Sequence, residues 1–306
     1  MKKMKALFIG ECMVELSDAG DGLLKKSFAG DVFNSAVYMK RRIKDNCEVS
    51  VLTAIGEDSI SREMEAFFEL QGLGTETVHK SSEGTVGLYL ISTDSEGERS
   101  FSYWREKSMA RLLMNLLDDR ATTISEYSAD LYFFTGITLA ILDADDREKL
   151  LAQLSEARKN GSKVAFDPNY RSQLWENKAV AAEWIDRAYK ISDIIFPGVD
   201  EEYELFGTKS VDNCISRLEK YAETEVVLKA GDEGIYVISG GNQTHLEFTP
   251  ADKVVDTTAA GDAFDGTYLA MRLRGNNSGD SLAKAASVAA KVVTYPGAIV
   301  PEALTR

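Results

Sequence analysis

The stretch from Val254 to Phe264 combines residue types that could bind phosphate and move a proton. Ala259-Ala260-Gly261 precedes an apolar pattern at helical spacing, so these amides are expected at the exposed start of a helix. Unpaired N–H groups and the helix dipole favour an anion there, and small side chains let a phosphate approach. Asp262 is unexpected beside an anion site, because its carboxylate would repel phosphate. Accepting a proton from an attacking hydroxyl is a chemistry that needs a carboxylate at this point.

The same aspartate has a simpler interpretation. A carboxylate in the first turn of a helix is stabilised by the helix dipole and needs no catalytic role.

The elements on either side of this turn can also be predicted. The two β-branched residues Val254 and Val255 are expected to form a strand before the turn, and the following helix is expected to stop at Gly275.

A second group of candidate residues lies on a predicted β-hairpin. Strands over 85–94 and 98–105 enclose a three-residue turn with glycine where a left-handed residue is wanted. The register that this turn sets places Tyr89 opposite Tyr103, and period-two alternation puts Arg105 on the same face as Tyr103. An arginine with two tyrosines could bind a hydroxylated carboxylate. An exposed edge hairpin with ordinary aromatic pairing explains the pattern equally well.

Composition limits the class of protein. The 306 residues are 44% apolar and 27% charged, as in an ordinary globular protein. The chain contains no run of about 18 apolar residues and starts with too short and too charged a segment for a secretory signal. Three scattered cysteines indicate reduced thiols, hence the cytoplasm. A net charge of −14 opposes binding to nucleic acid or anionic lipid. The two histidines lack spaced partners, which disfavours Ser-His-Asp hydrolysis and His-rich metal sites.

The elements that must position these residues follow a regular order. From about Asp130, strand and helix alternate, which is typical of a parallel sheet covered on both faces. Strands are expected at 130–135, 163–167, 193–196, 225–229 and 234–238, and helices at 144–160, 178–191, 211–223 and 278–293. Earlier elements are strands at 5–10 and 49–55 and helices at 30–43, with Asp31 as the cap, and at 59–70. Ligands bind at the carboxyl ends of such strands.

Three loops at those ends carry candidate residues. Arg171, after a strand and a stiffening proline, offers a two-pronged donor for a carboxylate or phosphate, or pairs with a neighbouring acid. Lys229 to Gly234 could approach a phosphorylated ligand or form an ordinary hairpin turn. The acids at 200–202 could hold Mg²⁺ through waters or simply start a helix.

These motifs occur in the order found in the ribokinase-like (PfkB-type) carbohydrate kinases, and nearly the whole chain resembles that family. The residues that carry the resemblance are Gly10-Glu11, Gly30-Asp31 with Asn34, Gly56-Glu57-Asp58, Thr135-Gly136-Ile137, Asp167 to Arg171, Lys229 to Gly234 and Asp256 to Asp262. Within the family the closer resemblance is to the 2-keto-3-deoxygluconate kinases, through Ile9 to Leu16, Gly87-Leu88-Tyr89, Gly97-Glu98-Arg99, Tyr103-Trp104-Arg105 and Asp167 to Arg171.

The resemblance implies an α/β fold over residues 1–306: a single three-layer α/β/α domain with a mostly parallel central sheet. Residues of about 12–29 and 84–105 would form a small β-sheet lid. It implies ATP-dependent phosphorylation of 2-keto-3-deoxygluconate at its terminal hydroxyl, with Mg²⁺ and K⁺ as expected ions. Small molecules are then the expected partners, with neither nucleic acid nor membrane. The open edge of the lid could be covered by a second subunit in a homo-oligomer.

The resemblance also implies residue roles. Asp262 would be the general base, and the amides of Ala259, Ala260 and Gly261 would form the anion hole. The residues implied to bind the substrate are, besides Asp262, Gly30, Asn34, Tyr89, Tyr103, Arg105, Asn169 and Arg171. Both arginines would bind the substrate carboxylate. Those implied for ATP are Lys229, Gly231, Gly234, Thr258 and Gly261. Those implied for metal ions are Glu201 for Mg²⁺, and Asp256, Thr258, Val292, Tyr295 and Gly297 for K⁺.

Two positions depart from the family pattern. Ala259 stands where glycine is usual, so the turn is expected to avoid a positive φ there. Gly198 replaces the asparagine of an Asn-x-x-Glu motif, which weakens the case for a direct metal contact by Glu201.

Other functions compete with this interpretation. A kinase of the same family for a neutral sugar such as fructose or ribose would not need two arginines. A non-catalytic sugar or nucleotide sensor would not need Asp262. A dinucleotide-dependent dehydrogenase is disfavoured, because no Gly-x-Gly-x-x-Gly follows the first strand. No residue distinguishes the gluconate-derived substrate from its galactonate epimer.

Overall fold

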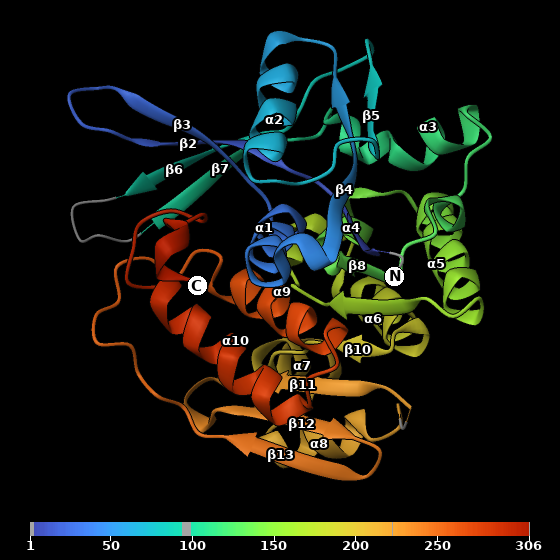
Figure 1. Cartoon of the computed structure of the whole chain (residues 1–306), viewed down its shortest axis with the longest axis vertical. Helices are drawn as coiled ribbons and strands as arrows, with labels where there is room; N and C mark the ends of the chain where they lie inside the picture. The colour runs from blue at the N-terminus through green and yellow to red at the C-terminus, as the bar shows by residue number, and fades with distance from the viewer. Residues whose placement is uncertain (1–2, 94–98, 222, 306) are drawn as a thin grey trace.

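A mostly parallel sheet runs through the middle of the protein (Figure 1). The structure is a computed structural model that describes residues 3–93, 99–221 and 223–305. Within these residues the sheet has nine strands, in the order β13-β12-β11-β10-β9-β8-β1-β4-β5, with β12 and β13 antiparallel to their neighbours. The strands are β1 (Met4–Ile9), β4 (Cys47–Gly56), β5 (Val78–Ser81), β8 (Leu131–Thr135), β9 (Lys163–Asp167), β10 (Ile194–Ile195), β11 (Glu225–Lys229), β12 (Ile235–Ser239) and β13 (Asn242–Leu246).

Helices cover both faces of this sheet. On β1, Ala6 and Phe8 contribute to one apolar core and Leu7 and Ile9 to the other, as period-two alternation requires of a strand buried on both sides. The first core is covered by α1 (Asp31–Ile43), α2 (Ser59–Leu70), α9 (Ala260–Leu273) and α10 (Ser278–Val292). The second is covered by α3 (Leu113–Asp119), α4 (Gly136–Ile141), α5 (Ala144–Lys159), α6 (Lys178–Ile191), α7 (Val199–Phe206) and α8 (Val211–Leu218). The expected α/β/α layers are confirmed.

A separate small sheet projects beside α1 and α10 (Figure 1). Its order is β3-β2-β6-β7, formed by β2 (Met13–Asp18), β3 (Leu24–Ala29), β6 (Leu88–Thr93) and β7 (Arg99–Trp104). Tyr89 pairs with Tyr103 across the hairpin, so the predicted register is confirmed. The predicted turn and its closing pair, residues 94–98, lie outside the described residues.

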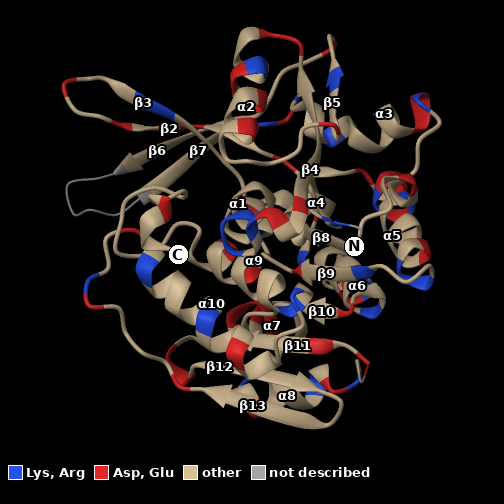
Figure 2. Ribbon diagram, in the orientation of Figure 1, with Lys and Arg blue, Asp and Glu red and all other residues tan. Residues whose placement is uncertain are grey.

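The charged residues are spread over the outer elements. Figure 2 shows the positions of acidic and basic residues interspersed along α2 and α5, although acidic residues outnumber basic ones by 49 to 35 in the whole chain. In the described part of the chain, we find no helix with the length and apolar character needed to cross a bilayer.

Three local predictions were wrong. Val254 and Val255 do not form a strand: Val254 is 62% exposed, and the Val255 amide donates to the Val293 carbonyl at the end of α10 instead of to a neighbouring strand. Asp31 does not cap α1, because Gly30 holds the cap position and the Asp31 side chain accepts from the adjacent Val32 amide. The helix expected over 211–223 ends at Leu218, after which the chain turns and buries Tyr221.

Close contact between α1 and α9 depends on Gly266. A Cβ at this position would clash with the Ser35 carbonyl oxygen and lie 3.0 Å from the Met39 amide nitrogen. Only glycine lets α9 approach the backbone of α1 this closely.

We therefore predict that Gly266→Ala lowers the free energy of unfolding by about 1–3 kcal/mol, because the added methyl forces the helices apart. Gly279→Ala on α10 is the matched control: its nearest contact, Asn277 Oδ1, would lie at 3.4 Å, so stability should be retained. Urea denaturation of both variants measures the effect. Equal stabilities would contradict the account of the helix contact.

Candidate active site

The turn before α9 is held in a left-handed conformation. Ala259 is the cap residue of α9 with φ +60° and ψ +14°, so the expectation that this position avoids a positive φ was wrong. The Asp256 carboxylate explains how the turn is maintained. It accepts hydrogen bonds from the amides of Thr258 at 2.9 Å and Gly297 at 2.7 Å, and so ties the turn to the loop that follows α10. These contacts offset a conformational cost of about 1–2 kcal/mol for a left-handed residue with a Cβ.

The start of α9 presents open space beside Gly261. A Cβ at this position would meet no atom within 4 Å, and the residue is exposed. Of the three amides predicted for the anion hole, that of Ala260 already donates weakly to the Thr257 carbonyl at 3.3 Å. An anion could approach the helix end here, as at other helix starts.

Asp262 is joined to α1 by a hydrogen bond. Its Oδ2 accepts from Asn34 Nδ2 at 2.8 Å, and Asn34 is only 4% exposed. On the same turn of α1, Asp31 Oδ2 accepts from Asn169 Nδ2 at 2.9 Å. The structure therefore brings the starts of α1 and α9 together with the loop after β9, where Asn169 has a φ of +33°.

The environment of Asp262 suits a proton acceptor. Burial, with a further contribution from the charge of Asp31, raises the pKa of Asp262 to about 7, although the hydrogen bond from Asn34 opposes the shift. A general base works best when its pKa lies near the operating pH.

Lys229 lies between two acids next to this group. Its Nζ is 3.1 Å from Asp167 Oδ2 and 3.9 Å from Oδ1 of Asp265, which is 1% exposed. Burial lowers the pKa of Lys229, but Asp167 and Asp265 outweigh it and hold the pKa above its usual range. Lys229, predicted to bind nucleotide, is thus already paired at the carboxyl ends of β9 and β11.

Glu201 does not have the geometry of a direct metal ligand. Its Oε1 accepts from the Tyr170 amide at 2.7 Å and its Oε2 from the Gly198 amide at 2.8 Å. Burial and the nearby Asp167 raise the pKa of Glu201 to about 7. Over residues 3–93, 99–221 and 223–305, no three His, Cys, Asp or Glu side chains are arranged to hold a metal ion.

The aromatic face of the small sheet reaches the start of α9. The rings of Tyr89 and Tyr103 lie 5.8 Å apart. Tyr89 belongs to a small apolar cluster with Met13, Ala29 and Ala298, and Ala259 packs against this cluster. The Tyr89 hydroxyl donates to Glu15, which also accepts from Ser27 Oγ at 2.8 Å. The predicted substrate face is thus placed beside the predicted phosphate site.

The two arginines predicted to share a carboxylate have different partners. Arg105 is buried and donates through Nη2 to Glu11 Oε2. Arg171 is exposed, and its Nη1 donates to the Tyr170 carbonyl at 3.0 Å. The two guanidinium groups therefore donate to different acceptors.

Two predicted nucleotide residues form the turn between β11 and β12. Ala230 donates its amide to the Gly234 carbonyl at 2.8 Å, closing the hairpin. Gly231 and Gly234 have positive φ values of 57° and 85°, and a Cβ on Gly234 would clash with the Leu246 carbonyl. Packing against β13 therefore accounts for Gly234.

The residues predicted for K⁺ lie near one another at the end of α10. Asp256 contacts Thr258 and Gly297 as described, and the Val292 carbonyl accepts from the Tyr295 amide at 3.1 Å. The negative end of the α10 dipole would favour a cation there.

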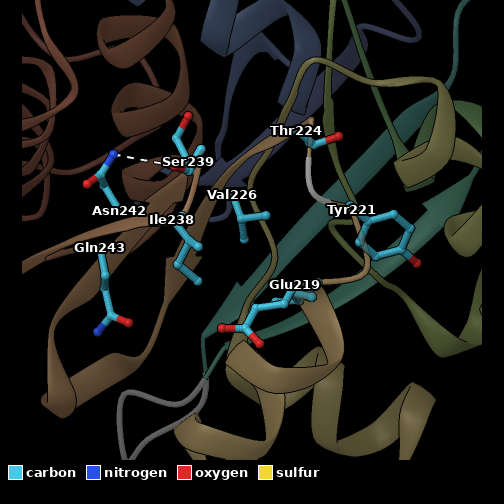
Figure 3. A pocket seen from close by; sticks show the side chains of 11 residues that line it. Glu219, Tyr221, Thr224, Val226, Ile238, Ser239, Asn242 and Gln243 are labelled. Carbon is cyan, nitrogen blue, oxygen red and sulfur yellow. Dashed lines mark hydrogen bonds between the residues drawn. The ribbon is translucent and has the colours of Figure 1, made fainter.

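A hollow of about 280 Å³ lies at the other end of β11 (Figure 3). Tyr221, Thr224 and Asn242 line it, and no predicted site residue does. The Thr224 hydroxyl donates to the Ser192 carbonyl, and the Asn242 amide to the Gly240 carbonyl. The hollow is therefore separate from the group of residues at the start of α9.

Four buried or half-buried acids that contact predicted site residues were assigned no site role from the sequence. These are Glu11, Glu15, Asp31 and Asp265. The Gly10-Glu11 motif marked Glu11 without indicating its partner, and Asp31 was taken for a helix cap. Asp265 lies one helical turn after Asp262, a spacing that could have placed it on the same face.

The whole chain matches one family of proteins. The model of the pfkB family of carbohydrate kinases covers residues 3–305. The chain belongs to this family. It is 40% identical to the 2-dehydro-3-deoxygluconokinase of Dickeya dadantii (strain 3937), over 96% of each chain, and 38% identical to that of Escherichia coli (strain K12), over 97% of each. The fold is shared with a solved structure: a fructokinase from Xylella fastidiosa with bound ATP has a TM-score of 0.81 at 22% identity, covering 97% of this chain and 94% of its own.

We predict that Asp262 titrates near pH 7 and that Asp31→Asn lowers this pKa, because a neighbouring negative charge no longer opposes ionisation. Carbon-13 NMR of aspartate-labelled protein measures the carboxyl directly, and Asp262→Asn identifies its signal. Asp21→Asn, in the exposed turn between β2 and β3, should leave the pKa unchanged. A pKa of about 3.9, the ordinary value for aspartate, would contradict the described environment.

Proposed function

We propose that the protein phosphorylates 2-keto-3-deoxygluconate at its terminal hydroxyl, using ATP, to give 2-keto-3-deoxy-6-phosphogluconate. The observation that carries this proposal is the position of Asp262, held by Asn34 beside the open start of α9. The names of the relatives that are 38–40% identical support the choice of substrate.

In this reaction Asp262 accepts the proton of the terminal hydroxyl as its oxygen attacks the γ-phosphorus. The new oxygen–phosphorus bond forms while the bond to the leaving ADP oxygen breaks. Phosphoryl transfer needs mainly positioning and charge stabilisation, which the amides of Ala259 and Gly261, supported by that of Ala260, supply at the helix start. The half-buried position of Asp262 keeps part of the bulk water away from it.

The sugar acid lies between the small sheet and the starts of α1 and α9. Its hydroxyls and carbonyl contact Gly30, Asn34, Tyr89, Tyr103 and Asn169. Its carboxylate accepts hydrogen bonds from Arg105 and Arg171. The packing of Ala259 against the apolar cluster that contains Tyr89 supports this placement, because it connects the small sheet to the start of α9. The small sheet then acts as a lid within a single domain.

ATP lies across the strand ends, near Lys229, Gly231, Gly234, Thr258 and Gly261. A Mg²⁺ ion held directly by Glu201 does not fit, because both its oxygens accept backbone amides. Mg²⁺ commonly keeps several waters and binds substrate phosphates, so we assign it to the nucleotide. K⁺ would be held near Asp256, Thr258 and the backbone of Val292, Tyr295 and Gly297, where it would add positive charge beside the helix start.

We also propose that a second copy of the chain covers the edge of the small sheet, giving a homo-oligomer. β7 is one of the two edge strands of this sheet and exposes Phe101, Tyr103 and Trp104. An exposed apolar edge strand is normally paired or covered. Three free, buried cysteines and the use of ATP favour the cytoplasm as the location.

We predict that Asp262→Asn lowers kcat by about 10²–10⁴-fold while ATP still binds, because the variant keeps the helix start and loses only the proton acceptor. Initial rates and calorimetric ATP titration measure the two effects. Asp212→Asn is a matched control, since Asp212 is an exposed acid in the first turn of α8. Near-normal turnover of Asp262→Asn would contradict the role as base and favour the alternative, in which Asp262 only stabilises the start of the helix.

We predict that the wild-type enzyme forms ADP far faster with 2-keto-3-deoxygluconate than with fructose or ribose. Arg171→Ala should raise KM for the keto acid by roughly 10–100-fold, the value of a hydrogen bond to a charged group, and leave KM for ATP unchanged.

Arg274→Ala, in the exposed turn after α9, is the control for the loss of an arginine. Equal rates with neutral sugars would indicate a neutral-sugar kinase, and absence of ADP formation with every sugar would indicate a sensor.

A further inference from the structure

The ion pair between Glu11 and Arg105 is buried and incompletely bonded. Glu11 is 2% exposed and Arg105 is 8% exposed. Arg105 Nη2 donates to Glu11 Oε2, but Glu11 Oε1 and Arg105 Nε have no hydrogen-bond partner among the described residues. One unpaired acceptor and one unpaired donor thus belong to the same two side chains.

The chemistry of the two unpaired atoms defines the group that would satisfy them. Along one edge of a guanidinium, Nε and Nη2 usually bind the two oxygens of one carboxylate. Here only the Nη2 contact is made. A hydroxyl both accepts and donates, so a single hydroxyl could accept from Arg105 Nε and donate to Glu11 Oε1. A carboxylate accepts only, so it has no proton to donate to Glu11 Oε1.

The pair lies among the residues proposed to bind the sugar acid. The Glu11 carbonyl oxygen is in contact range of Gly30, and Glu11 Oε1 would lie 2.8 Å from a Cβ on Gly87. The Arg105 guanidinium lies 5.9 Å from the centre of the Tyr103 ring. Glu11 follows β1 of the large sheet and Arg105 follows β7 of the small sheet, so the pair also joins the two sheets.

We propose that Glu11 and Arg105 form a subsite for one hydroxyl of the sugar acid, in which Glu11 Oε1 accepts from the hydroxyl and Arg105 Nε donates to it. The subsite rests on the proposed function. It leaves the other N–H groups of Arg105 for the substrate carboxylate. Recognition by a paired acceptor and donor gives strong discrimination, because a substrate without the hydroxyl leaves both buried atoms unpaired.

The test combines Glu11→Gln with analogues of 2-keto-3-deoxygluconate that lack the hydroxyl at C4 or at C5. In the wild type, kcat/KM should fall by roughly 10–100-fold for the analogue that lacks the bound hydroxyl. Glu11→Gln should show a similar fall with the complete substrate and little further fall with that analogue. KM for ATP should not change. Glu83→Gln, an exposed acid on another loop, should behave as the wild type.

Two outcomes would overturn the subsite. If the wild type has the same kcat/KM for both deoxy analogues as for the complete substrate, this pair binds neither hydroxyl. If Glu11→Gln lowers kcat/KM equally for complete and deoxy substrates, Glu11 only holds Arg105 in place. The proposed function fails separately, when the wild type forms no ADP with the complete keto acid.

A crystal structure of the wild type with the keto acid provides the test if Glu11→Gln does not fold. A substrate hydroxyl within hydrogen-bond distance of both Glu11 Oε1 and Arg105 Nε supports the subsite. A water molecule in that position, with the substrate elsewhere, overturns it.

Discussion

The hydrogen bond from Asn34 to Asp262 is the contact on which the organisation of the site depends. It joins α1 to α9, two helices that are far apart in the sequence and that pack closely because Gly266 has no side chain. The same approach places Asp31 near Asp262 and, through Asn169, connects both helices to the loop after β9. The sheet and its two helix layers thus position the starts of α1 and α9 and the loop after β9 close to one another.

Electrostatics explains why this point suits a kinase of the pfkB family. Asp167 and Asp265 flank Lys229, and Glu201 and Asp262 also interact with its charge. Asp31 adds a further negative charge next to Asp262, and all five acids are partly or fully buried. Burial and mutual repulsion raise the pKa of Asp262 and of Glu201 to about 7. An acidic group of this kind opposes phosphate, so an incoming nucleotide depends on the helix start and on the cations it brings. The same repulsion favours proton uptake by Asp262.

The sequence predicted those structural features that depend on residues close together in the chain. The turn residues expected between the two hairpin strands predicted the pairing of Tyr89 with Tyr103, and the alternation after Asp130 predicted the layered sheet. It did not predict features that depend on distant partners. Ala259 adopts a positive φ because Asp256 clamps its loop to Gly297, and Arg105 is paired because β1 brings Glu11 beneath the small sheet. Neither contact could be predicted, because each joins residues far apart in the sequence and produces no periodic pattern of residue types.

The central claim is that the Asp262 carboxylate removes the proton from the terminal hydroxyl of the sugar acid. A crystal structure with 2-keto-3-deoxygluconate and a non-hydrolysable ATP analogue measures this most directly. The account predicts that an Asp262 oxygen lies about 2.6–3.2 Å from the terminal hydroxyl oxygen, with the γ-phosphate at the start of α9 on the opposite side of that oxygen. A terminal hydroxyl held by another group, with the Asp262 carboxylate turned away from it, would contradict the account.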